Sequence, residues 1–412
     1  MNYKKLQIRI FTLSWLSYAF YYVSRKNFSV VKSTLHEDLG FSMVQLGTIE
    51  TLYAGSYMLG QFISGALGDK LGPRKLLTFG MFGSAITSII MGLSVAYSIF
   101  AFSLVFNGLF QSTGWANNLK AMTPWFNQES RGKVTGFWCT CYTAGPIIAT
   151  ATATYLLVNY SWQTAFIIPG ILVMAVGALV FFFLIDSPEK AGFESSEVTP
   201  SREINEKSKT PFMQMITHPT VIVYGIAYAF IKFVRYSFTF WLPWYLYERL
   251  GFSKGDSGYV SVAFEMGGFF GVIGIGVLSD KYFSKNRAKI VVICIMAMAG
   301  ALYLYQLFGG ADMLLNVLLL ALIGFMLFGG DSVLSASATQ DIGGKEATAS
   351  AVGIVNGIGS LGGVCGGVIP ALITQRFGWS ALFYFLIFST IFAGVLLSVC
   401  TQKKGTRIDR QN

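Results

Sequence analysis

The chain has 412 residues, of which 53% are hydrophobic and only 12% are charged, and it contains 45 glycines and 36 phenylalanines. A soluble domain of this length does not need so much apolar surface, and frequent glycine is typical of packed membrane helices. About 20 apolar residues span a bilayer, so the chain is long enough to cross it many times. The composition therefore excludes a soluble protein and predicts an all-α membrane protein.

Twelve apolar segments are predicted as transmembrane helices. They cover residues 7–33, 44–68, 74–94, 98–122, 133–157, 163–185, 220–246, 257–279, 288–307, 313–336, 347–374 and 379–401. The N-terminus, MNYKKLQIRIF, has no small-residue cleavage site after its apolar run, so we expect the first helix to be retained. A polar segment separates the sixth helix from the seventh. We therefore expect an N-terminal half (1–185), a cytoplasmic linker (186–219) and a C-terminal half (220–412).

Lysine and arginine are unevenly distributed among the predicted loops. If both termini are cytoplasmic, the inner loops and tails hold 21 of the 30 Lys and Arg residues. The outer loops then hold four, when residues at span ends are counted with the adjacent loop: Lys32, Arg249, Lys254 and Arg376. This distribution follows the positive-inside rule and predicts cytoplasmic termini. It also accounts for the net charge of +10 without a nucleic-acid partner, since the basic residues form no patch interleaved with aromatic residues.

Cysteine and histidine give no sign of a metal site or an enzyme. All five cysteines lie in apolar runs without disulfide or metal-ligand spacing: Cys139, Cys141, Cys294, Cys365 and Cys400. The two histidines, His36 and His218, lie at helix ends, and no nucleophile motif is present. We therefore expect no metal, no cofactor and no catalytic residues.

The two halves repeat one another at an offset of about 211 residues. GALGDKLGPRK (65–75) recurs as GVLSDKYFSKNR (276–287), which aligns Asp69 with Asp280. Two parallel six-helix repeats are the organisation of the major facilitator superfamily, which the paired G-x-L-x-D-K loops also resemble. An aspartate in such a loop can cap a helix and pair with loop cations, so we expect Asp69, Arg74, Asp280 and Arg287 to latch the cytoplasmic side. The alternative is a basic loop that serves only membrane topology.

Arg25 and Arg235 align in this repeat, and each lies within a predicted first helix of its half. A charge at the bilayer centre costs roughly 2.5–3.5 kcal/mol on insertion scales, so such residues are expected to be functional. A two-fold axis between the repeats would bring both guanidinium groups to one central cavity, where they repel unless a doubly charged anion lies between them. Guanidinium donors match the oxygens of phosphate and carboxylate. The sequence therefore predicts an anion site.

The alternative is that each arginine pairs with a buried carboxylate for folding alone. Three acids lie within the predicted spans, Glu50, Glu265 and Asp331. The same spans hold five cations: Arg25, Lys26, Lys120, Lys232 and Arg235. Lys120 lies near a helix end, where its side chain can reach the interface. The remaining four cations still outnumber the acids, which favours a positive cavity.

Five motifs together resemble the organophosphate:phosphate antiporters, the branch of that superfamily that carries glycerol-3-phosphate, hexose-6-phosphates and phosphoglycerates. The motifs are YYVSRKNF on the first helix, NGLFQSTGW (107–115) with RG at 131–132, RYSFTFWLPWYL (235–246), FEMGGFFGVIGIGVLSDK (264–281) and KEATASAVGIVNGIGSLGG (345–363). They occur in the family's order over nearly the whole chain.

The resemblance implies roles for individual residues. It implies that Arg25 and Arg235 clamp the phosphoryl group, and that Tyr18, Tyr22 and Trp115 line the pocket. It also implies that Lys26 and Glu265 take part in the charge rearrangement that accompanies transport. Asp331, which has no usual counterpart in the family, joins this charge-relay group as a candidate.

The chain departs from the family pattern at several positions around the expected pocket. Gln61 stands where a lysine is usual, and Lys232 stands where the glycerol-phosphate members have a tyrosine. Ala116 and Asn117 replace two prolines, and Tyr142 aligns with a histidine of some members. We include Lys232 and Tyr142 among the substrate-binding candidates. Lys232 either replaces the missing lysine or is a structural residue paired with Glu265 or Asp331.

The predicted function is a secondary active transporter that exchanges an organic phosphate for inorganic phosphate by alternating access. We expect a monomer in a bacterial inner membrane or its equivalent. One alternative is a proton-coupled organic-anion symporter that uses Glu50, Glu265 or Asp331 as a proton carrier. Another is a transporter-like sensor of sugar phosphates, which the family also contains.

Overall fold

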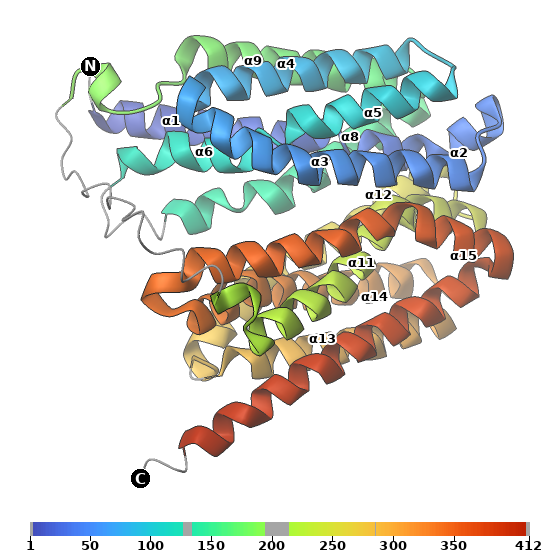
Figure 1. Cartoon of the computed structure of the whole chain (residues 1–412). Helices are drawn as coiled ribbons and strands as arrows, with labels where there is room; N and C mark the ends of the chain where they lie inside the picture. The colour runs from blue at the N-terminus through green and yellow to red at the C-terminus, as the bar shows by residue number, and fades with distance from the viewer. Residues whose placement is uncertain (1–2, 127–133, 194–213, 285, 409–412) are drawn as a thin grey trace. The chain divides into compact units, whose positions relative to one another are not determined.

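The computed structural model describes residues 3–126, 134–193, 214–284 and 286–408, without the side chains of 65, 66, 69, 343–349 and 401–408. Every regular element in this part is helical (Figure 1). The N-terminal elements are α1 (Tyr3–Val23), α2 (Asn27–Leu39), α3 (Met43–Leu71), α4 (Pro73–Gly92), α5 (Tyr97–Gln111), α6 (Gly114–Met122), η1 (Thr123–Trp125), α8 (Cys141–Asn159), α9 (Thr164–Phe183) and η2 (Glu189–Ala191). The C-terminal elements are α11 (Pro219–Glu248), α12 (Lys254–Tyr282), α13 (Arg287–Phe308), α14 (Met313–Ser332), the π-helical η3 (Val333–Ala338) and α15 (Thr339–Ile408).

Each of the twelve predicted apolar segments coincides with helical residues, and this confirms the all-α prediction. Within the described part, eight helices are long and apolar enough to cross a membrane by length and composition. The last of these, Ser350–Cys400, has 51 residues, and Gly378 adopts a positive φ of 81° within it. Gly378 divides α15 into a first limb before this glycine and a second limb after it. Only glycine adopts this conformation without strain, so the chain turns there between the two predicted segments.

The first predicted span is two helices rather than one. It separates into α1 and α2 at a turn formed by Ser24, Arg25 and Lys26. The fourth span likewise separates into α5 and α6 at Ser112 and Thr113. Non-helical backbone at membrane depth is tolerated only where protein or a water-filled cavity surrounds it. Both breaks therefore require other parts of the protein around them, and Ser24, Lys26, Ser112 and Thr113 are indeed buried.

The chain divides into two compact units, Met1–Ile204 with Phe252–Tyr259 and Asn205–Gly251 with Val260–Asn412. In the first unit α1 packs on α8 and α9, α3 packs on α5, and α4 lies along α9, as Figure 1 shows. Much of the predicted linker, residues 194–213, lies outside the described residues. The boundaries predicted for the linker therefore stay a prediction.

In the second unit α11 packs against both limbs of α15, and α13 packs on α14 and α15 (Figure 1). The glycine-rich segment at 353–367 explains the close approach of α11 to the first limb. A Cβ atom at Gly362 would overlap the carbonyl oxygen of Ala229, and the Trp241 indole donates hydrogen bonds to the carbonyls of Gly366 and Gly367. Small residues let membrane helices pack backbone to backbone, which fixes the position of α11 and of the arginine it carries.

Candidate functional site

The turn between α1 and α2 places Arg25 inside the first unit. The backbone N–H groups of Arg25 and Lys26 both donate to the carbonyl of Tyr22, over 3.0 and 2.9 Å. On either side, Ser24 Oγ lies 3.0 Å from Ser84 Oγ and Asn27 Nδ2 donates to the carbonyl of Ala165 over 3.1 Å. Ser and Asn side chains offer the backbone partners that compete with a continuous helix. The turn is thus anchored to α4 and α9.

The Arg25 guanidinium is held by a neutral amide and three aromatic rings. Arg25 Nε donates to Gln111 Oε1 over 2.8 Å. Its Cζ lies 4.6, 4.9 and 5.6 Å from the ring centroids of Tyr22, Tyr57 and Tyr53. None of the described carboxylates forms an ion pair with it. The positive charge of Arg25 is therefore stabilised by cation–π contacts but is not neutralised.

An aromatic cluster forms around the part of α1 that precedes Arg25. The Tyr18 ring meets the rings of Tyr22 and Trp115 edge to face at centroid distances of 5.8 and 5.2 Å. Trp115 in turn lies 6.4 Å from Tyr142. The structure thus brings together the four predicted pocket residues of this half. Tyr21 is also on α1, but its hydroxyl lies 2.9 Å from the Thr113 hydroxyl and its side chain belongs to the core.

The second arginine has a different environment. Arg235, on α11, donates from Nη1 to Asp331 Oδ2 over 3.0 Å, and its Cζ lies 4.5 Å from the Phe328 ring centroid. The side chains of Arg235 and Asp331 are 18% and 5% exposed. Asp331 is the second-to-last residue of α14, which is followed by the π-helical η3, a type of irregularity that is frequent at functional sites. Here the guanidinium faces a carboxylate, as the alternative interpretation of the sequence anticipated.

Lys232 lies one turn before Arg235 on the same helix. Its Nζ donates to Ser360 Oγ at 3.4 Å, a long hydrogen bond, and lies 4.7 Å from the Tyr228 ring centroid. Asp331 and Arg235 both interact with it electrostatically. The Asp331 carboxylate is ion-paired to Arg235, and the cluster of two cations and one acid keeps an excess of positive charge.

Among the other charge-relay candidates, Lys26 and Glu265 are both buried, at 6% and 4% exposure. A further buried pair was not anticipated. Lys32 on α2 donates to Glu50 on α3, and the two side chains are 0% and 4% exposed. The charge count placed Lys32, near the end of the predicted span 7–33, with the adjacent outer loop. The helix continues to Leu39, and Lys32 is buried within it. The signal in the sequence was Glu50, an acid in an apolar span that requires a cation.

The predicted gating residues differ in their environments. Arg287 Nη2 contacts Asp280 Oδ1 at 2.9 Å, and Arg287 Nη1 contacts Asp341 Oδ1 at 3.0 Å. In the other unit the backbone N–H of Arg74 donates to Asp186 Oδ1 over 2.8 Å, so that Asp186 caps the first turn of α4. The side chain of Asp69 and the RG motif at 131–132 lie outside the described residues. Lys120 donates to the carbonyl of Gly68 over 3.0 Å, which keeps its ammonium at the end of α3.

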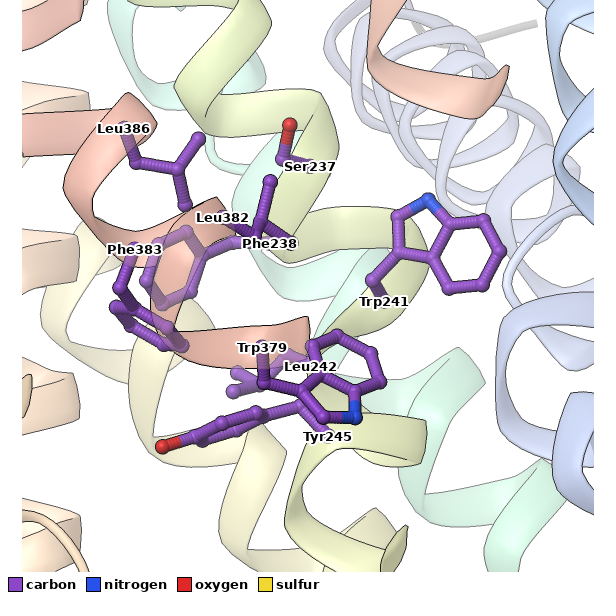
Figure 2. A pocket seen from close by; sticks show the side chains of 9 residues that line it. All are labelled: Ser237, Phe238, Trp241, Leu242, Tyr245, Trp379, Leu382, Phe383 and Leu386. Carbon is purple, nitrogen blue, oxygen red and sulfur yellow. The ribbon is translucent and has the colours of Figure 1, made fainter. Parts of the chain in front are cut away.

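A separate pocket lies between α11 and the second limb of α15 (Figure 2). Its lining is almost entirely apolar and consists of Ser237, Phe238, Trp241, Leu242, Tyr245, Trp379, Leu382, Phe383 and Leu386. No guanidinium or ammonium group lines it, so this pocket does not have the chemistry of an anion site. No three His, Cys, Asp or Glu side chains of the described part are grouped to hold a metal ion.

The sequence reasoning missed Gln111, Tyr53 and Tyr57 as partners of Arg25. Gln111 lies within the motif NGLFQSTGW, and Tyr53 and Tyr57 are four residues apart, so they share one face of α3. A polar residue in an apolar helix and two tyrosines on one face were the available signals. Neither signal names Arg25 as the partner, because α3 and α5 meet the turn only in the folded unit.

Comparisons with known proteins identify the family of the chain. The model of the Major Facilitator Superfamily matches residues 14–364. Sugar phosphate exchanger 3 of Xenopus laevis is 30% identical over 99% of this chain and 96% of its own length. Glucose-6-phosphate exchanger SLC37A2 of Mus musculus is 28% identical over 94% of this chain and 90% of its own length.

A bacterial homologue of the human lysosomal transporter Spinster, solved inward-facing and unoccupied, has a TM-score of 0.80 over 96% of both chains. At 15% identity it shows the shared fold alone. The fold makes the chain an integral, multi-pass membrane protein, and the family is one of transporters rather than enzymes. The chain belongs to the Major Facilitator Superfamily and, as its sequence motifs predicted, to the organophosphate:phosphate antiporter family within it.

Proposed function

We propose that this protein exchanges an organic phosphate for inorganic phosphate across a cytoplasmic-type membrane, with Arg25 and Arg235 binding the phosphoryl group. The observation that carries the proposal is Arg25, a partly buried guanidinium without a carboxylate partner among the described residues. A cation held at membrane depth without neutralisation is costly, and an anionic ligand supplies the missing charge. The sugar phosphate exchangers among the relatives support a phosphorylated substrate.

The aromatic cluster supports the same substrate class. Tyr22 contacts Arg25, and the rings of Tyr18, Trp115 and Tyr142 extend the aromatic surface from there. Such surfaces suit a sugar or a glycerol backbone, which combines apolar C–H faces with hydroxyl groups. In the second unit Lys232 adds a point charge one turn from Arg235, which suits an additional acidic group of the substrate.

Exchange follows from differential binding. An anion that interacts with both arginines stabilises the closed intermediate, whereas an empty site leaves two positive charges in a medium of low dielectric constant and disfavours closure. Alternating access is then permitted in the loaded state only. We further propose that the protein acts as a monomer in a bacterial inner membrane or its equivalent, with both termini cytoplasmic, because lysine and arginine concentrate in the inner loops and tails.

The test uses purified protein in liposomes loaded with inorganic phosphate. We expect uptake of labelled phosphate that requires internal phosphate, and a panel of organic phosphates should compete with it. Liposomes without internal phosphate are the control. Robust uptake into empty liposomes, driven by a proton gradient, would contradict exchange and favour the proton-coupled symporter. The buried carboxylates of Glu50 and Asp331 make that second candidate worth the same assay, although each is ion-paired in the structure.

A further inference from the structure

Gln111 connects Arg25 to the interior of the first unit. It is the last residue of α5 and its side chain is fully buried. Its Oε1 accepts from Arg25 Nε over 2.8 Å and from the Tyr53 hydroxyl over 3.0 Å. Its Nε2 donates to Asn107 Oδ1 over 2.6 Å and to the hydroxyls of Ser24 and Ser84, each over 3.2 Å. Both ends of the amide are therefore fully used.

The orientation of this amide is dictated by the backbone. Asn107 Nδ2 lies 3.2 Å from the carbonyl oxygen of Ser84, which can only accept a hydrogen bond. Asn107 must therefore direct its NH₂ group to Ser84 and its carbonyl oxygen to Gln111. Gln111 must in turn present its NH₂ group to Asn107, which leaves its carbonyl oxygen for Arg25. The main-chain carbonyl of Ser84 in α4 thus fixes the orientation of the Asn107 amide, which fixes that of Gln111 next to the guanidinium.

This arrangement determines which donors of Arg25 remain for a ligand. Nε is occupied by Gln111, whereas Nη1 and Nη2 form no hydrogen bond within the described residues. The rings of Tyr22 and Tyr57 contact the guanidinium and restrict the orientation of its plane. The two terminal nitrogens form the end-on fork that binds two oxygens of one anion. Because the Gln111 amide is neutral, it orients the fork without cancelling the charge, in contrast to Asp331 at Arg235.

We infer that Gln111 is the positioning residue for the phosphate-binding fork of Arg25. The inference rests on the proposed function, because it assigns a role in the same anion site. A neutral hydrogen-bond acceptor is required at this position, and a carboxylate there would neutralise the arginine. Shape alone is not sufficient, since glutamate and glutamine have nearly the same volume.

The experiment measures phosphate exchange in liposomes for the wild type, Gln111→Leu and Gln111→Glu. Loss of one hydrogen bond to a charged group predicts that the KM for phosphate rises roughly tenfold to a hundredfold in Gln111→Leu. Gln111→Glu should be at least as impaired despite its matching shape. Asn316→Leu is the matched control, because Asn316 is a fully buried amide in α14 that contacts Tyr305 and Gly309 instead. Its KM should stay unchanged even if less folded protein is recovered.

A binding cycle separates positioning from general packing. Phosphate-induced stabilisation of purified protein is measured for Gln111→Leu, Arg25→Lys and the double variant, so that variants without transport still give a result. If Gln111 acts through Arg25, the double variant should bind no more weakly than Arg25→Lys alone. Additive losses, or a wild-type KM in Gln111→Glu, would overturn the inference while leaving the exchange function intact. Absence of phosphate exchange in the wild type would instead refute the proposed function itself.

Discussion

Arg235 Nη1 lies 3.0 Å from Asp331 Oδ2, whereas Arg25 faces the neutral amide of Gln111 at 2.8 Å. The two repeats therefore hold their aligned arginines by chemically different partners. An anion that approaches Arg235 meets a guanidinium that is already ion-paired with Asp331. Phosphate and Asp331 are expected to compete for the same donors, so that the affinity at Arg235 is reduced by the energy of the ion pair.

Asp331→Asn should reveal this competition. The variant keeps the shape of the side chain but removes its charge, so without ligand the protein should be less stable, since Arg235 and Lys232 lose their counterion. Phosphate should then restore more stability than it does in the wild type, because nothing competes for Arg235. The measurement is the phosphate-induced change in Tm. A smaller phosphate effect in Asp331→Asn than in the wild type would show that Asp331 assists binding instead.

Replacement of either arginine by lysine should impair exchange. Lysine keeps the charge but cannot present a planar fork, and at position 25 it also loses the contact to Gln111. We expect phosphate affinity to fall by about 1.5–3 kcal/mol for each variant, the size of a hydrogen bond to a charged group. Initial rates of labelled-phosphate exchange check this. Near-normal exchange by both Arg25→Lys and Arg235→Lys would rule out the clamp.

Lys232→Gln tests whether this lysine binds substrate. If its ammonium reaches the phosphoryl group or a second acidic group, affinity should fall by roughly 1–3 kcal/mol. The double change Gln61→Lys with Lys232→Tyr, which restores the usual family residues, should then recover part of the binding. Substrate competition curves provide the measurement. If Lys232→Gln lowers only the yield of folded protein, the lysine is structural and acts through Ser360 and Asp331.

The Lys32–Glu50 pair is expected to be structural and sensitive to removal of one partner. Both side chains are buried, so Glu50→Gln removes the carboxylate charge next to the buried Lys32 ammonium and should cost about 3–5 kcal/mol of stability. The double variant Lys32→Met with Glu50→Leu removes both charges and should recover most of this loss. Thermal unfolding of the three variants in detergent is the measurement. A double variant as unstable as Glu50→Gln would contradict this account, and loss of proton-driven uptake in a stable Glu50→Gln would favour the symporter.

Arg287→Gln should alter transport more than stability. Arg287 contacts both Asp280 and Asp341, whose side chains are 71% and 33% exposed. Exposed ion pairs contribute only about 0–1 kcal/mol to stability. If the pairs latch one conformational state, their loss should instead change the rate of exchange and the accessibility of single cysteines to a membrane-impermeant reagent. Unchanged accessibility and rate would leave this loop with a role in membrane topology only.

The amino-acid sequence by itself determined the class of fold and the predicted spans that carry the key charges. Apolar segments of bilayer length must form helices, because lipid offers the backbone no hydrogen-bond partners. The internal repeat then aligned Arg25 with Arg235, and the motifs identified the family. These inferences depend on local composition and on spacing along the chain, which the sequence states directly.

The tertiary structure alone decided which groups surround those charges. The breaks at Ser24–Lys26 and at Ser112–Thr113 were not predicted, since each lies inside a segment that was predicted as a single span. Arg25 meets Gln111 across 86 residues and Arg235 meets Asp331 across 96. Which polar group pairs with which depends on how whole helices pack, and helix packing is set by the summed contacts of many side chains rather than by any local pattern.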